Sequence, residues 1–71
     1  MIRPGIYEHY KGGRYQVHFV AKFEENMQPM VVYEALYDNP EGPYFVRPLD
    51  VFLDEVEIDG AIKPRFRFIG E

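Results

Sequence analysis

The side chains able to do chemistry in this chain of 71 residues are few, because it contains no cysteine, serine or threonine. The thiol and hydroxyl nucleophiles of covalent catalysis are therefore absent. Two histidines, His9 and His18, could serve as a general base or as metal ligands. No His-x-x-x-His or glutamate-paired spacing accompanies them, so we predict neither a metal site nor a cofactor. A small enzyme that uses His9 is only a remote alternative.

Cationic and phenolic side chains favour a different chemistry, the binding of an anionic or carbonyl-rich ligand. His9, Tyr10 and Lys11 follow one another at the end of a predicted strand, where His9 and Lys11 project to the same side. Arg47 and Arg65 each adjoin a proline. Their planar guanidinium groups suit a carboxylate or a phosphate.

We predict that some of these side chains converge beside the loop 23–29, where Glu25 orients His9 or an arginine. The complete set of predicted ligand-binding residues is His9, Tyr10, Lys11, Glu25, Tyr33, Arg47 and Arg65. The competing interpretation is that both arginines form internal salt bridges and serve only the fold. The acids that could neutralise them are Glu34, Asp50 and Asp54.

Turn signals punctuate the chain about every eight to twelve residues, a spacing typical of an all-β sandwich or barrel. The pairs Gly12-Gly13 and Asp59-Gly60 predict tight hairpins, because glycine readily adopts positive φ. The predicted strands cover residues 6–10, 15–23, 30–37, 44–47 and 63–69. Residues 49–56 are the one helical candidate, since Pro48 precedes them and apolar residues recur at helical spacing.

Alternation over residues 15–23 predicts a half-buried strand, with Val20 as the one apolar residue on the polar face. Residues 30–37 are apolar at almost every position, which predicts a central strand covered on both faces. We predict an all-β fold, a small SH3-like antiparallel barrel with one short helical turn, formed by residues 1–71 as a single domain. Its predicted core consists of Tyr15, Val17, Phe19, Val31, Tyr33, Ala35, Val46, Phe52 and Phe66.

The overall charge and composition narrow the range of partners. The net charge of −4 argues against nucleic acid, because proteins held by phosphate contacts are normally basic. The chain has no apolar run long enough for a membrane span and no secretion signal. The absence of cysteine fits a reducing compartment, so we expect a cytoplasmic location. Most of the twelve aromatic residues are needed as core in so small a chain.

Four segments together resemble a known family. They are G-x-Y-x-H-Y-K-G-x-x-Y from Gly5, V-V-Y-x-A-L-Y from Val31, R-P-L-x-x-F from Arg47 and P-R-F from Pro64. The chain is similar along nearly its whole length to a family of short bacterial domains with no assigned activity. It departs from that family's pattern at Phe23, Asn26, Gln28 and Phe45. The resemblance implies a lineage and a single domain, and it implies no reaction.

Besides the remote enzymatic alternative, two functions are compatible with these observations. We expect a binding module whose partner is a protein or small ligand, recognising a peptide, a modified residue or a nucleic-acid feature. A protein-interaction or homo-oligomerisation domain, such as a homodimer, is the second interpretation. A concave pocket with converging arginine, histidine and tyrosine tips would favour the first, whereas a flat apolar patch would favour the second.

Overall fold

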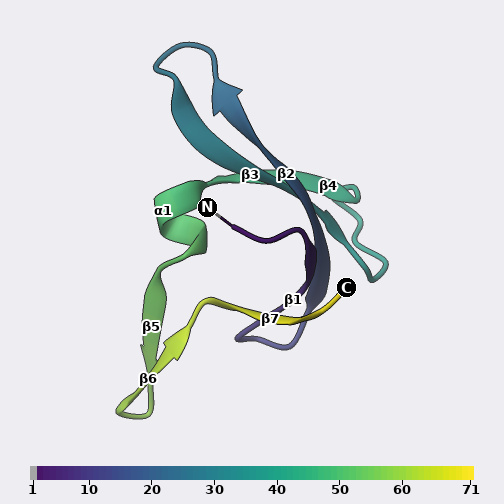
Figure 1. The fold of residues 1–71 in the computed structure, drawn as a ribbon. Helices are drawn as coiled ribbons and strands as arrows, with labels where there is room; N and C mark the ends of the chain where they lie inside the picture. Colours follow the sequence, from purple (N-terminus) through teal and green to yellow (C-terminus); the bar gives the residue numbers. More distant parts are fainter. Residues whose placement is uncertain (1) are drawn as a thin grey trace.

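Seven strands and one helical turn make up the part of the chain described by the computed structural model, residues 2–71 (Figure 1). In chain order they are β1 (Gly5–His9), β2 (Arg14–Phe23), β3 (Gln28–Ala35), β4 (Tyr44–Pro48), α1 (Leu49–Phe52), β5 (Glu55–Ile58), β6 (Ala61–Pro64) and β7 (Phe66–Gly70). The predicted all-β class and the single short helical turn are confirmed. No helical segment within residues 2–71 has the length and hydropathy needed to cross a membrane.

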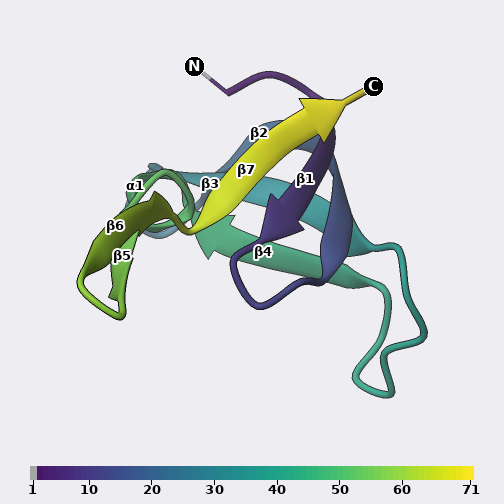
Figure 2. The same ribbon diagram turned by 90° about the horizontal axis from the view of Figure 1, so that it is seen from below.

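Five strands form one curved antiparallel sheet in the order β4-β3-β2-β1-β7, while β5 and β6 pair separately as a hairpin. Figure 2 shows this curved sheet with β4 and β7 as its edge strands. No strand pairing joins β4 to β7 within residues 2–71, so the predicted closure of the barrel is absent. We call the unpaired line between β4 and β7 the seam. Pro48 ends β4 and has no N–H with which to extend the ladder, and the chain turns there into α1.

Strand β2 carries one extra residue relative to β3. Val17 and Phe19 lie opposite two consecutive residues of β3, so His18 between them forms a β-bulge. Beyond the bulge the alternation of β2 is inverted, and Val20 packs against the core. The predicted inward face is therefore correct at Val17 but wrong at Phe19, whose side chain is 59% exposed. The bulge also explains why Val20 breaks the pattern of the sequence.

The core lies on the concave side of the sheet and is mostly aromatic. Phe52 of α1 stacks on Phe66 of β7 with ring centroids 4.0 Å apart and planes within 4° of parallel. Tyr7 is also buried there, as expected for most aromatic residues of so small a chain, and its hydroxyl donates to the carbonyl of Arg3. The buried residues are Tyr7, Val17, Val31, Tyr33, Ala35, Phe52 and Phe66, and Tyr15 packs against them while partly exposed.

Strand β4 presents the opposite face from the one predicted. Val46 is 60% exposed rather than buried, because the register of β4 on β3 places Phe45 and Arg47 on the core side. Strand β3 is central in the sheet, since it pairs with both β2 and β4. Its burial nevertheless alternates, so it is covered on one face and not on both as predicted.

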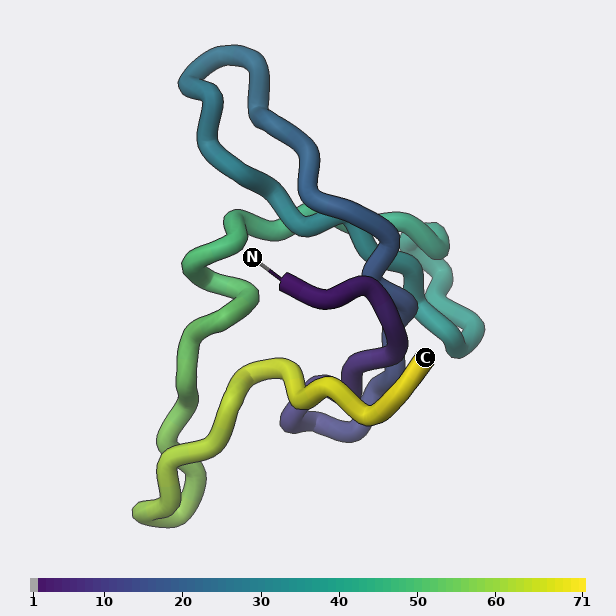
Figure 3. Tube along the Cα trace, viewed as in Figure 1, coloured from purple at the N-terminus to yellow at the C-terminus, as the bar shows by residue number. Residues whose placement is uncertain are grey.

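The turns follow the glycine signals, whereas the element boundaries differ. Gly12 has φ 106°. Asp59 and Gly60 have φ 52° and 81°, and a two-residue hairpin turn requires such positive values at both of its central residues. The helical turn has four residues instead of the predicted eight, because β5 already begins at Glu55. The predicted strand 63–69 is broken by a bend at Arg65, which separates β6 from β7. Figure 3 shows the β2–β3 and β5–β6 hairpins extending away from the body towards opposite ends.

Candidate functional site

The ring of Phe66, at the start of β7, brings side chains of three strands together. His9 lies opposite Phe66 in the β1–β7 register, and its imidazole meets the ring edge to face with centroids 4.8 Å apart. The guanidinium carbon of Arg47, from β4 across the seam, lies 5.7 Å from the centre of the same ring. His9 and Arg47, far apart in sequence, thus meet at the seam.

Arg47 also meets a group of tyrosine hydroxyls. Its Nε donates to the hydroxyl of Tyr33, 3.4 Å away, and the ring of Tyr33 is buried. Tyr15 packs edge to face against both Tyr33 and Phe66, and its hydroxyl shares a hydrogen bond with that of Tyr37. Burial, and after it this hydrogen bond, raises the pKa of Tyr15 to about 12. Tyr15 is therefore a neutral hydrogen-bonding group at ordinary pH.

Arg65 is held at the bend between β6 and β7 by its backbone. Its N–H donates to the carbonyl of Asp54, and its carbonyl accepts from the N–H of Tyr10, each at 3.0 Å. The side-chain Nε is buried and has no hydrogen-bond partner within residues 2–71. A buried donor without an acceptor is costly, so the position is poised for an added acceptor.

Neither Arg47 nor Arg65 is neutralised by a carboxylate within the described part of the chain. The ion pairs there involve other cations, and Glu34, one of the acids expected to compete, instead holds His18 at 2.9 Å. The interpretation in which salt bridges consume both arginines is therefore wrong for residues 2–71. Twelve acids in the chain leave these two cations unpaired, which is the most informative property of the site.

The positive charges of Arg47 and Arg65 act on His9. Burial, followed by the positive charges of Arg47, Arg65 and Lys11, holds the pKa of His9 below its usual value. Its Nδ1 accepts a hydrogen bond of 3.1 Å from the backbone N–H of Lys11, so the neutral ring carries its proton on Nε2. The ring of Tyr10 lies against it, with centroids 4.4 Å apart. The imidazole is therefore fixed in orientation on two sides.

Glu25 does not belong to this group of residues. It is exposed in the turn 24–27 that joins β2 to β3. Figure 1 shows this turn at the far end of the molecule from the turn between β1 and β2, next to which His9 lies. The predicted site therefore gathers beside the β1–β2 turn and not beside the loop 23–29.

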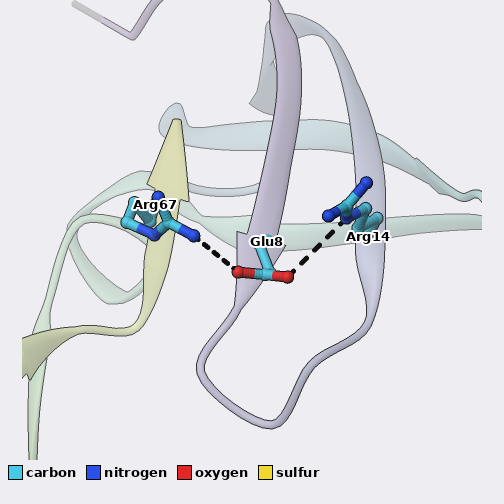
Figure 4. Close-up of polar contacts among 3 residues, drawn as sticks. All are labelled: Glu8, Arg14 and Arg67. Atoms are coloured by element: carbon cyan, nitrogen blue, oxygen red, sulfur yellow. Dashed lines mark hydrogen bonds and ion pairs between the residues drawn. The ribbon is translucent and has the colours of Figure 1, made fainter. Parts of the chain in front are cut away.

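A second polar cluster on the convex face of the sheet adjoins the site. Glu8 accepts a hydrogen bond of 2.7 Å from Arg67 and lies 3.6 Å from Nε of Arg14, and Figure 4 shows it between the two guanidinium groups. The hydrogen bond from Arg67 is the main cause that lowers the pKa of Glu8. Two guanidinium groups share one carboxylate here, so this cluster keeps a net positive charge.

An open cleft of about 450 Å³ runs between the two clusters and shares only His9 and Tyr10 with the predicted site. Its lining consists of Glu8, His9, Tyr10, Gly12, Lys63, Pro64 and Arg67. The contribution of Lys63 and Pro64 could not be read from the sequence, because it depends on how the β5–β6 hairpin folds back. Within residues 2–71 there is no cluster of three or more histidines and carboxylates able to hold a metal ion.

Comparison with known proteins places the chain in a family. A family model described as "Protein of unknown function (DUF1653)" matches residues 5–68. The crystal structure of a DUF1653 protein from Bordetella bronchiseptica is 35% identical in sequence, covering 97% of this chain and 88% of that one, with a TM-score of 0.93. No curated protein matches. The chain therefore belongs to the DUF1653 family, a family of unknown function, in agreement with the resemblance found in the sequence.

Proposed function

We propose that this domain is a binding module that recognises an anionic group, a carboxylate or a phosphate, at the seam. The observation that carries the proposal is that His9 and Arg47 meet at the ring of Phe66, directly after Arg65 in the chain, with no carboxylate paired to either arginine within residues 2–71. Cations held close together repel one another, and an anion between them relieves that repulsion. The partner is a protein or a small ligand that carries such a group.

The surroundings of these cations suit a single anionic group better than an extended polyanion. Phe66 and the partly buried tyrosines reduce contact with water, which strengthens each charge-assisted hydrogen bond. Tyr33 and Tyr10 supply neutral partners beside the guanidinium and imidazole groups. The net charge of −4 opposes a long phosphate backbone, so a peptide carboxylate or a modified residue fits better.

The test is a titration of the protein with acetate or inorganic phosphate while the His9 ring signals are followed by NMR. We expect saturable shifts and a rise in the pKa of His9, because a nearby anion favours the charged imidazole. Concentrations up to about 50 mM detect dissociation constants in the millimolar range. A stronger response to one probe than to the other distinguishes a carboxylate ligand from a phosphate ligand.

Single substitutions separate a ligand role from a structural one. Arg47→Met and Arg65→Met keep side-chain length and remove the charge, so each should abolish the shifts with little loss of stability. Lys22→Met, near the distal β2–β3 turn, removes the same charge and should leave the shifts intact. Unchanged His9 signals with both probes, or equal shifts in the wild type and in Arg47→Met, would show that the proposal is incorrect.

A further inference from the structure

The convex face of the sheet carries an apolar surface created by the bulge at His18. Beyond the bulge, β2 directs Phe19, Ala21 and Phe23 away from the core, although their spacing continues the core face of Val17. The register continues this surface across β3 and β4. Phe19, Val32 and Val46 form one row, and Ala21, Met30 and Pro48 form the next.

These two rows contain no charged residue. Phe19 and Val46 are exposed, and the other four residues of the rows are half-buried. The exposed convex face of an antiparallel sheet is ordinarily polar, yet Phe19, Val46 and the adjoining Tyr44 are 59%, 60% and 66% exposed. We call this surface the outer patch; its principal members are Phe19, Phe23, Met30, Val32, Tyr44 and Val46. An exposed apolar patch of this kind marks an interaction site.

The size of the outer patch matches a modest interface between two copies. At about 200 Å² for a whole aromatic side chain, the exposed parts of Phe19, Phe23 and Tyr44 with their aliphatic neighbours amount to roughly 500 Å². Two such patches face to face bury about 1,000 Å², the lower limit for a specific interface and typical of a reversible one.

The charges at the two ends of the patch are complementary under a two-fold axis. Glu24 and Glu25 lie in the turn at one end. At the other end of β2 lies Arg14, 63% exposed, which shares the single carboxylate of Glu8 with Arg67 and so leaves a net positive charge there. Each end is about 15 Å from Phe19 at ~3.3 Å per residue. An antiparallel pair with Phe19 near the axis therefore brings the acidic turn of each copy to Arg14 of the other. A parallel pair would instead place the acidic turns together.

We infer that the outer patch is a symmetric interface through which two copies of this chain associate reversibly. An isologous contact needs one self-complementary surface, and this face has an apolar centre with opposite charges at its ends. The anion site lies on the concave side of the sheet and remains accessible in such a dimer. The inference is thus independent of the proposed ligand function.

Sedimentation of the full chain up to about 0.5 mM tests the inference, since weak interfaces of this size need high concentration. The wild type should show a reversible monomer–dimer equilibrium. Phe19→Glu should raise the dimer dissociation constant by about 100-fold or more, because each dimer buries the new charge twice. Ile62→Glu places the same charge at an equally exposed apolar residue of β6 and should leave the equilibrium unchanged. A monomeric wild type, or a Phe19→Glu variant that still dimerises, would overturn the inference.

A charge exchange tests the antiparallel arrangement. At low salt, Arg14→Glu should weaken dimerisation several-fold, and Arg14→Glu combined with Glu25→Arg should restore most of the loss. Failure of the double variant to recover would exclude the antiparallel pairing. Thermal unfolding of each variant confirms that it remains folded, because exposed substitutions usually change stability little.

Discussion

Replacement of Phe52 by leucine tests whether α1 is the element that completes the core. Phe52 is only 1% exposed, and its ring stacks on Phe66 at 4.0 Å and meets Tyr7 and Tyr33 edge to face at 5.5 and 5.4 Å. Leucine retains most of the buried apolar area but loses these aromatic contacts, each worth about 0.5–1.5 kcal/mol. It also leaves part of the ring volume unfilled.

We expect Phe52→Leu to lower the free energy of unfolding by about 2–3 kcal/mol, which corresponds to a fall in Tm of roughly 10–20 °C. The whole domain should have a stability of about 4–10 kcal/mol at this length. Phe52→Ala should lower the free energy of unfolding by about 3–5 kcal/mol, and it should therefore leave much of the protein unfolded at room temperature. For this reason the leucine variant is the informative one.

Urea denaturation followed by circular dichroism measures the change, with the slope of the transition checked for constancy. Phe19→Leu is the matched control, because it makes the same substitution at an exposed ring and should cost less than about 0.5 kcal/mol. Equal losses in Phe52→Leu and Phe19→Leu would refute the view that α1 supplies a core residue rather than a surface turn.

Three further predictions concern a turn and two ionisable side chains. Gly60→Val should cost about 1–3 kcal/mol by strain at φ 81°, since its Cβ would meet no neighbour, and an unchanged denaturation midpoint would contradict the hairpin geometry. The pKa of His9 is lower in the folded state, so on acidification the unfolded chain binds this proton at a higher pH than the folded chain does. The free energy of unfolding should therefore fall as the pH drops below about 6.5 towards the pKa of the folded state. His9→Asn, which retains an acceptor, should remove that part of the pH dependence in thermal unfolding, and an identical profile would contradict it. Tyr15, with its pKa raised to about 12, should resist ionisation in absorbance titrations, and stability should decline as pH rises above about 10, an effect absent in Tyr15→Phe.

The sequence was sufficient for the elements whose signals are local. The glycine at position 60 and its neighbour Asp59 fix a hairpin turn wherever they occur, and alternation locates β2. The bulge at His18 could not be read, because Val17, His18 and Phe19 are all acceptable strand residues and only pairing with β3 reveals the extra one. The error at Phe19 follows from that single insertion.

The candidate site was predictable only in part, because it too depends on strand register. Arg47 was assigned to the candidate site because of its residue type, but the alternation of the sequence placed its neighbour Val46 in the core. The larger ring of Phe45 gains more by burial than Val46 does, and alternation then carries Arg47 to the concave side with it. Glu25 was misplaced although the length of β2 was predictable: its ten residues carry the turn about 33 Å from the start of the strand, whereas His9 lies beside that start.

The seam between β4 and β7 also has a mechanical consequence. Sheet edges held by a ladder separate only when several backbone hydrogen bonds break together, whereas these edges are bridged by side chains such as Arg47 over Phe66. The covalent link between them passes through α1 and the β5–β6 hairpin. Within residues 2–71, no backbone ladder therefore resists a separation of these two edges, and the packing of side chains, above all Phe52 on Phe66, holds them together.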